Sequence, residues 1–217
     1  MSDKQDGSIL QRDKETYAIV PRTPAGVLSL EFIEKLAEVV RRYEIPITKI
    51  TSGHRLALVG LKKEQIDQVW NDLGADIGRA TELCLHYVQA CPGNQVCSLG
   101  VQDSLGMGIE LEKRYVGLEM PAKLKVGVSG CPMTCSEGYV RDIGLIGKRS
   151  GWVVTYGGNS GGRPRIADVI AEELSGDATL ALVDKLVAFY RENGKKRERV
   201  ARMVERLGID EVKAAVL

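Results

Sequence analysis

The chain has 217 residues, with 30 Lys and Arg against 29 Asp and Glu, which gives a formal net charge of +1. A chain of this length can bury a sizeable core, and its near-neutral balance favours neither nucleic acid binding nor disorder. No apolar run approaches the length of a membrane span, and the polar N-terminal segment lacks the apolar region of a secretory signal. We therefore expect a cytoplasmic globular protein that binds neither nucleic acid nor a membrane.

The segment over residues 1–16 is expected to be disordered, and the first folded part spans residues 17–74. TYAIV predicts a strand, and SLEFIEKLAEVVRRYE predicts an amphipathic helix with Ser29 at its N-cap. ITKITS and RLALVG predict two further strands, and KKEQIDQVWNDL predicts a second helix that ends at Gly74. This order of elements indicates a small α+β unit.

The second part, residues 75–165, contains the cysteines. TELCLHYVQA predicts a helix that leads to Cys91, and GIELEKRY predicts another helix. AKLKVGVSG predicts a strand that runs into Cys131, and DIGLIG and GWVVTYGG predict a pair of strands. Residues 166–217 are charged, and DVIAEELSG, TLALVDKLVAFYRENG and KKRERVARMVERLG predict a helical C-terminal extension.

Four of the 5 cysteines lie in two short stretches, CPGNQVC at 91–97 and SGCPMTC at 129–135. An odd number of thiols in a reducing compartment favours metal or redox chemistry over disulfides. Four thiolates from two loops could enclose an iron–sulfur cluster, because Gly and Pro let backbone N–H groups approach the sulfides. The Cys-x5-Cys spacing fits a zinc knuckle poorly, but zinc and unrelated buried thiols remain alternatives. Cys84 is interpreted as a core residue.

Beyond the cysteines, several flanking motifs resemble those of the sirohaem and [4Fe–4S] nitrite and sulfite reductases. PRTPAGV at 21–27, KITSGHRLALVGLKK at 49–63, GVQDSLGMGIELEKRYVGL, AKLKVGVSGCPMTC, DIGLIG and YGGNSGG follow the family's order over residues 17–165. The motif at 49–63 is most similar to the assimilatory nitrite reductases. The larger enzymes carry two copies of this module and this chain has one, so it most resembles the low-molecular-mass assimilatory-type sulfite reductases.

The resemblance implies a ferredoxin-like half domain over 17–74, then a sirohaem and [4Fe–4S]-binding α+β domain over 75–165. It also implies that the cluster ligands are Cys91, Cys97, Cys131 and Cys135, and that Cys135 is shared with the sirohaem iron. Such a shared thiolate would couple the two centres electronically.

The resemblance further implies cationic side chains over the substrate anion, namely Arg22, Lys123 and Lys125. Lys123 and Lys125 alternate along the expected strand and so share a face, which would otherwise be interpreted as solvated. Sirohaem carries carboxylates that need cations and polar donors. The candidates for these contacts are Lys49, His54, Arg55, Asn94, Gln95, Thr134, Arg141, Asn159, Arg163 and Arg165. Gly53 stands where some members of the family have arginine, so the carboxylate contacts there must differ.

The expected reaction is the six-electron reduction of sulfite to sulfide. Alternatives are a nitrite reductase that makes ammonia, a sirohaem-carrying electron-transfer subunit, and a zinc-stabilised binding module. No Rossmann loop, flavin signature or second cluster motif is present in the sequence, so an external donor such as a ferredoxin is expected. Because the chain has a single copy, that copy must supply both the cluster and the substrate cations, or two chains must share the task as a homodimer.

Overall fold

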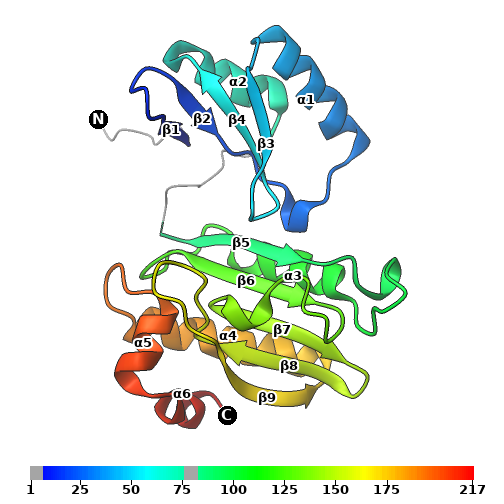
Figure 1. Cartoon of the computed structure of the whole chain (residues 1–217), viewed down its shortest axis with the longest axis vertical. Helices are drawn as coiled ribbons and strands as arrows, with labels where there is room; N and C mark the ends of the chain where they lie inside the picture. Colours follow the sequence, from blue (N-terminus) through cyan, green and yellow to red (C-terminus); the bar gives the residue numbers. More distant parts are fainter. Residues whose placement is uncertain (1–6, 76–82) are drawn as a thin grey trace. The chain divides into compact units, whose positions relative to one another are not determined.

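The computed structural model describes residues 7–75 and 83–217, which fall into two compact units divided after residue 82 (Figure 1). Each unit combines one β-sheet with packed helices. The predicted α+β class is confirmed.

The first unit contains a four-stranded antiparallel sheet in the order β1-β2-β4-β3. Its strands are β1 (Ser8–Leu10), β2 (Tyr17–Ile19), β3 (Ile47–Ile50) and β4 (Leu56–Leu61). The expectation that residues 1–16 are disordered is wrong for β1, which pairs with β2. The turn between them is closed by Asp13, whose Oδ1 accepts a hydrogen bond from Thr16 N at 2.9 Å. Residues 1–6 lie outside the described part of the chain.

Two helices, α1 (Leu30–Arg42) and α2 (Ile66–Leu73), cover one face of this sheet. The predicted cap of α1 is confirmed, since Ser29 Oγ accepts a hydrogen bond from Phe32 N at 3.2 Å. The predicted end of α2 is also confirmed, because Gly74 adopts the left-handed conformation, with φ 59°. The core lies between helices and sheet and includes Ile19, Val39, Leu58, Leu61, Val69 and Trp70.

The second unit is built on a five-stranded mixed sheet in the order β5-β6-β7-β8-β9. Its strands are β5 (Leu85–Ala90), β6 (Leu124–Ser129), β7 (Ile143–Lys148), β8 (Gly151–Tyr156) and β9 (Asp168–Leu174). The first three strands run parallel, and β8 and β9 pair antiparallel. The predicted strands β6, β7 and β8 are confirmed.

Two stretches that were predicted to be helical are strands of this sheet. TELCLHYVQA contains β5 (its first two residues lie outside the described part), and DVIAEELSG contains β9. Most side chains of β5 are buried on both faces, so the stretch lacks the alternation that marks a half-buried strand. In β9 the helix-favouring Ala and Glu residues are overridden by pairing with β8. His86, which was expected on a helix, therefore lies on β5.

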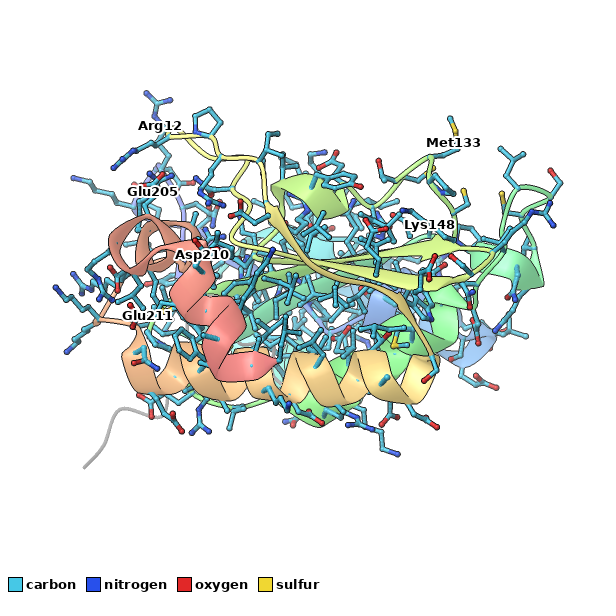
Figure 2. The ribbon with its side chains drawn as sticks, turned by 90° about the horizontal axis from the view of Figure 1, so that it is seen from below. Arg12, Met133, Lys148, Glu205, Asp210 and Glu211 are labelled. Atoms are coloured by element: carbon cyan, nitrogen blue, oxygen red, sulfur yellow. The ribbon has the colours of Figure 1, made fainter. Side chains whose placement is uncertain are left out.

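Two long helices, α3 (Ser104–Tyr115) and α4 (Gly176–Asn193), lie against one face of the second sheet (Figures 1 and 2). An ion pair joins them, with Arg114 Nη1 at 3.0 Å from Asp184 Oδ2. The chain ends in α5 (Val200–Leu207) and α6 (Ile209–Val216), which pack with α4. The short 3-10 turns are η1 (Pro24–Gly26), η2 (Lys63–Gln65), η3 (Gly93–Gln95) and η4 (Gly138–Val140).

A buried ion pair fastens the start of α5 to the sheet. Asp142, which is fully buried, accepts hydrogen bonds from Arg199 Nη2 at 2.6 Å and from Arg199 Nε at 3.2 Å. It also accepts one from the backbone N–H of Lys125 at 2.8 Å. Burial raises the pKa of Asp142, whereas the charge of Arg199 lowers it. The guanidinium of Arg199 therefore offsets part of the free-energy cost of burying the charged carboxylate of Asp142.

Replacing Arg199 with Ala should lower the free energy of unfolding by about 3–5 kcal/mol at neutral pH, because it leaves a buried carboxylate unpaired. Without Arg199 the pKa of Asp142 rises further, and the folded state then binds a proton more tightly than the unfolded chain does. Acidification thus favours folding of the variant, and its deficit relative to the native chain should shrink as the pH falls. Urea denaturation at several pH values measures this.

The matched control is Arg202→Ala, which removes the ion pair with Glu205 on the surface of α5. We expect it to cost about 1 kcal/mol or less at every pH. A deficit for Arg199→Ala that is small, or that is the same at acidic and neutral pH, would contradict the role of the buried pair.

Candidate functional site

Both cysteine loops leave the second sheet at the same edge. Cys91 follows β5 directly, and Cys131 comes two residues after the end of β6. These strands are parallel neighbours, with Ala90 opposite Val128 in the register. Since the carboxyl ends of parallel strands meet at one edge of a sheet, the pairing brings two segments that are about forty residues apart in sequence side by side.

Hydrogen bonds join the two loops directly. Gly130 N donates to Cys91 Sγ at 3.2 Å, and Cys91 N donates to Val128 O at 3.1 Å. Gly130 O accepts from Val101 N at 2.8 Å and from Gln102 N at 3.0 Å. A Cβ on Gly130 would stand 2.7 Å from Gln102 O, so only glycine allows this approach. The cysteines are thus held on backbone that the fold has already ordered.

The second cysteine loop then folds back over the sheet. Ser136 N donates to Ser129 Oγ at 3.0 Å, which draws the segment after Cys135 onto β6. A Cβ on Gly127 would stand 2.4 Å from Ser136 O, so this glycine lets the loop lie flat on the strand. Figure 2 shows Met133 on the side of the sheet opposite α4. Cys135 therefore belongs to the face that α3 and α4 leave open.

All the predicted ligand cysteines are free thiols. Cys97 and Cys135 are exposed, Cys91 is partly buried and Cys131 is buried. Within residues 7–75 and 83–217, no three His, Cys, Asp or Glu side chains converge as the ligands of a single metal ion. An iron–sulfur cube spreads its thiolates more widely than one ion does, and the N–H that Gly130 directs at Cys91 suits a sulfur that carries charge.

Lys125 lies on the same open face of the sheet as the Cys135 loop, because it precedes Gly127 by two residues on β6. Its Nζ is 5.8 Å from the centroid of the Tyr87 ring, and Arg141 Cζ is also 5.8 Å from that centroid. Burial, and then the charge of Arg199, lowers the pKa of Lys125. Lys123 stands just before the strand and is partly buried. Only Lys125 is therefore part of β6, and the predicted shared face of Lys123 and Lys125 lies at the start of this strand.

Arg141 is the most buried of the predicted sirohaem contacts. Its Nη2 donates to Gln89 Oε1 at 2.8 Å and its Nη1 donates to Ser160 Oγ at 3.0 Å. It also forms an ion pair with Glu137. Among the described residues its buried Nε has no hydrogen-bond partner. A buried guanidinium with an unused donor suits an anionic group brought to this face.

The other predicted contacts in the second unit lie around the loops. Asn94 borders a hollow of about 540 Å³ beside the first cysteine loop, and Gln95 Nε2 donates to Asp103 Oδ1 at 2.9 Å. Thr134 has a positive φ of 51° within the second loop. Three polar residues after β8 are engaged internally: Asn159 Nδ2 donates to Arg163 O, Arg163 pairs with Glu205, and Arg165 pairs with Asp168.

The predicted residues of the first unit gather around two connected turns. Thr23 Oγ1, next to Arg22, donates to His54 O at 2.8 Å, which ties the loop at 21–27 to the turn at 51–55. His54 has a positive φ of 57°, and Thr51 N donates to Arg55 O at 2.7 Å. Lys49 lies on the exposed strand β3. The structure therefore brings Arg22 near the His54–Arg55 turn within this unit.

Sequence reasoning missed several residues at the open face and the loops. Gln89 and Glu137 hold Arg141, Asp142 and Arg199 flank Lys125, and Ser104 contacts Cys91. Because TELCLHYVQA was interpreted as a helix, the placement of Tyr87 and Gln89 on one face of β5 was not predicted. Arg199 lies 57 residues from Asp142, so no local pattern could pair them.

Replacing Gly127 with Ala should lower the free energy of unfolding by about 1–3 kcal/mol, since the new methyl group forces the Cys135 loop off the strand. Gly162→Ala is the control, because a Cβ there has no heavy atom within 4 Å. Chemical denaturation compares the two. Equal stability of both variants would show that the loop does not depend on its contact with Gly127.

Comparison with known proteins covers almost the whole chain. Residues 83–217 match the family model of the nitrite and sulphite reductase 4Fe-4S domain, and residues 9–76 match that of the nitrite/sulfite reductase ferredoxin-like half domain. The second match confirms the predicted ferredoxin-like half. Over residues 7–75 and 83–217, every helix is too short or too polar to span a membrane.

Two curated relatives illustrate the range of lengths. An assimilatory-type sulfite reductase from Nitratidesulfovibrio vulgaris is 57% identical over 217 residues, which is all of both chains. A nitrite reductase [NAD(P)H] from Bacillus subtilis is 38% identical over 95% of this chain, but the match spans only 26% of that relative.

Solved structures agree in fold. A dissimilatory sulfite reductase I superposes with a TM-score of 0.81 at 14% identity, over 93% of this chain and 69% of that one. The NirA protein of Mycobacterium tuberculosis also gives 0.81, at 18% identity, over 93% of this chain and 39% of that one. These structures share the fold, and the two family-model matches with the 57% identical relative show that the chain belongs to the nitrite and sulfite reductase family.

Proposed function

We propose that this chain is a sulfite reductase, which adds six electrons and seven protons to sulfite and releases hydrosulfide and three waters. The observation that carries this proposal is the 57% identity to an assimilatory-type sulfite reductase over the full length of both chains. Nitrite reductases among the relatives are less similar, at 38% and 35% identity, and the chain spans only 26% of each.

Cys91, Cys97, Cys131 and Cys135 are proposed to hold a [4Fe–4S] cluster, with Cys135 also ligating the sirohaem iron. Support comes from the shared strand edge, the free thiols and the N–H that Gly130 directs at Cys91. The exposure of Cys97 and Cys135 leaves their sulfurs accessible to such a group. When bound, these two centres would supply single electrons in succession to the substrate.

Cations of the chain are proposed to bind the substrate and the sirohaem carboxylates. Lys123, Lys125 and Arg22 would bind the substrate anion, and the two lysines would hand protons to its departing oxygens. The lowered pKa of Lys125 makes its ammonium a readier proton donor than an exposed lysine. Arg141, with its unused donor, leads the set proposed for the carboxylates, which also comprises Lys49, His54, Arg55, Asn94, Gln95, Thr134, Asn159, Arg163 and Arg165.

The internal ion pairs of Arg163 and Arg165 limit how these two residues could bind a sirohaem carboxylate. Each guanidinium already faces an acidic side chain, Glu205 or Asp168. Contact with a sirohaem carboxylate would therefore have to add to these pairs or displace them. Arg141 also pairs with Glu137, but its Nε has no hydrogen-bond partner among the described residues, so we assign it the larger share of carboxylate binding.

Electrons would come from a separate carrier protein such as a ferredoxin, since the sequence carries no motif for a nicotinamide or flavin group. We place the enzyme in the cytoplasm, where its thiols stay reduced. A homodimer would let one chain supply cations to the site of the other, as the two copies do within the larger enzymes.

Nitrite reduction is the second candidate, and the observation that favours it is the presence of several nitrite reductases among the relatives. Anaerobically purified protein, assayed with reduced methyl viologen, separates the two. We expect sulfide formation from sulfite with a higher kcat/KM than ammonia formation from nitrite. The reverse order would assign the chain to nitrite, and no turnover of either anion in a fully loaded sample would indicate an electron-transfer subunit.

Replacing Lys125 or Lys123 with Ala should lower kcat/KM for sulfite roughly 100-fold while the absorption spectrum stays unchanged, because a cation is lost where charge develops on the substrate. Steady-state kinetics measures this. Lys113→Ala, on the exposed side of α3, is the control and should behave like the native enzyme. Native kinetics in both lysine variants would show that Lys123 and Lys125 do not act on the substrate and belong to a solvated face.

A further inference from the structure

Ser104 contacts Cys91 from a part of the chain that the proposed function leaves unassigned. It is the first residue of α3 and is fully buried. Its Oγ lies 3.2 Å from Cys91 Sγ and donates a hydrogen bond to Cys91 O at 2.8 Å. One hydroxyl thus stands beside both the sulfur and the carbonyl oxygen of a proposed cluster ligand.

The start of α3 does not require a serine at this position. The N-cap of the helix is Asp103, whose Oδ1 accepts a hydrogen bond from Gly106 N at 2.9 Å. Two glycines lie close to the hydroxyl. A Cβ added to Gly93 would stand 2.5 Å from Ser104 Oγ, and one added to Gly130 would stand 3.0 Å from it. Two glycines therefore make room for a hydroxyl that helix capping does not explain.

The sulfur of Cys91 has two neighbours able to donate hydrogen bonds. The first is Gly130 N, at 3.2 Å. The second is the Ser104 hydroxyl, whose single proton points to Cys91 O when the cysteine is a thiol. An iron-bound thiolate carries no proton and can only accept, so that proton would turn toward Sγ or be shared between the two acceptors. Hydrogen bonds to a ligating thiolate favour the more negative state of a cluster, so they raise its reduction potential.

We propose that Ser104 is a positioning residue that orients Cys91 and raises the reduction potential of the [4Fe–4S] cluster. The proposal rests on the assignment of Cys91 as a cluster ligand. In the step concerned, one electron passes from the carrier to the cluster, and no bond forms or breaks. The hydroxyl makes that transfer more favourable by stabilising the added negative charge on the sulfur.

The test is a reductive titration of the anaerobically purified holoenzyme, followed by the electron paramagnetic resonance signal of the reduced cluster. In Ser104→Ala the midpoint potential should be more negative than in the native enzyme. Ser104→Cys keeps a side chain with only a weak donor, so its midpoint should fall in between. Ser98→Ala, which removes an exposed hydroxyl from the same loop, is the control and should keep the native midpoint.

The outcomes distinguish this inference from the proposed function. Native midpoints in both Ser104 variants, with native iron and sulfide content, would overturn the role of Ser104 and leave the sulfite reductase proposal intact. Absence of an iron–sulfur signal in the native protein would overturn the proposed function itself. If Ser104→Ala fails to load its cluster, Ser104→Cys decides the matter, and an unshifted midpoint there refutes the inference.

Discussion

The parallel pairing of β5 with β6 is the constraint on which the rest of the second unit depends. It places the ends of both strands at one edge of the sheet, so Cys91 and Cys131 begin their loops side by side. Neither loop could hold four thiols alone, and ordering them separately would cost conformational entropy. The hydrogen bonds through Gly130 instead join the two loops into one structure.

The two faces of this sheet have different roles. Helices α3 and α4 bury one face and supply the core. The other face has glycine at two paired positions, Gly127 on β6 and Gly144 on β7, and there the returning loop lies close against the strands. Lys125 and Arg141 flank the Tyr87 ring on this face, which gives it positive charge beside the cysteine loop. A small anion and a polycarboxylate cofactor both need such a surface.

Features that depend on neighbouring residues could be predicted from the sequence, whereas contacts between residues far apart in the chain could not. Capping by Ser29, the stop at Gly74 and the strand that leads to Cys131 depend on neighbouring residues, and they were predicted from the sequence. The TELCLHYVQA stretch was misassigned because a strand buried on both faces has no alternation, and β9 was misassigned because pairing with β8 overrode its helix-favouring residues. Arg199 and Ser104 were missed because their partners, Asp142 and Cys91, are close only in the fold. The ligand and substrate roles of individual residues remain predictions.

The most direct test of the account is the metal content and visible spectrum of the chain, expressed anaerobically in a host that makes sirohaem. Four thiols that cage an iron–sulfur cube, one of them shared with a tetrapyrrole iron, predict about five irons and about four acid-labile sulfides per chain, together with sirohaem bands. A colourless protein with one zinc and no acid-labile sulfide would contradict it.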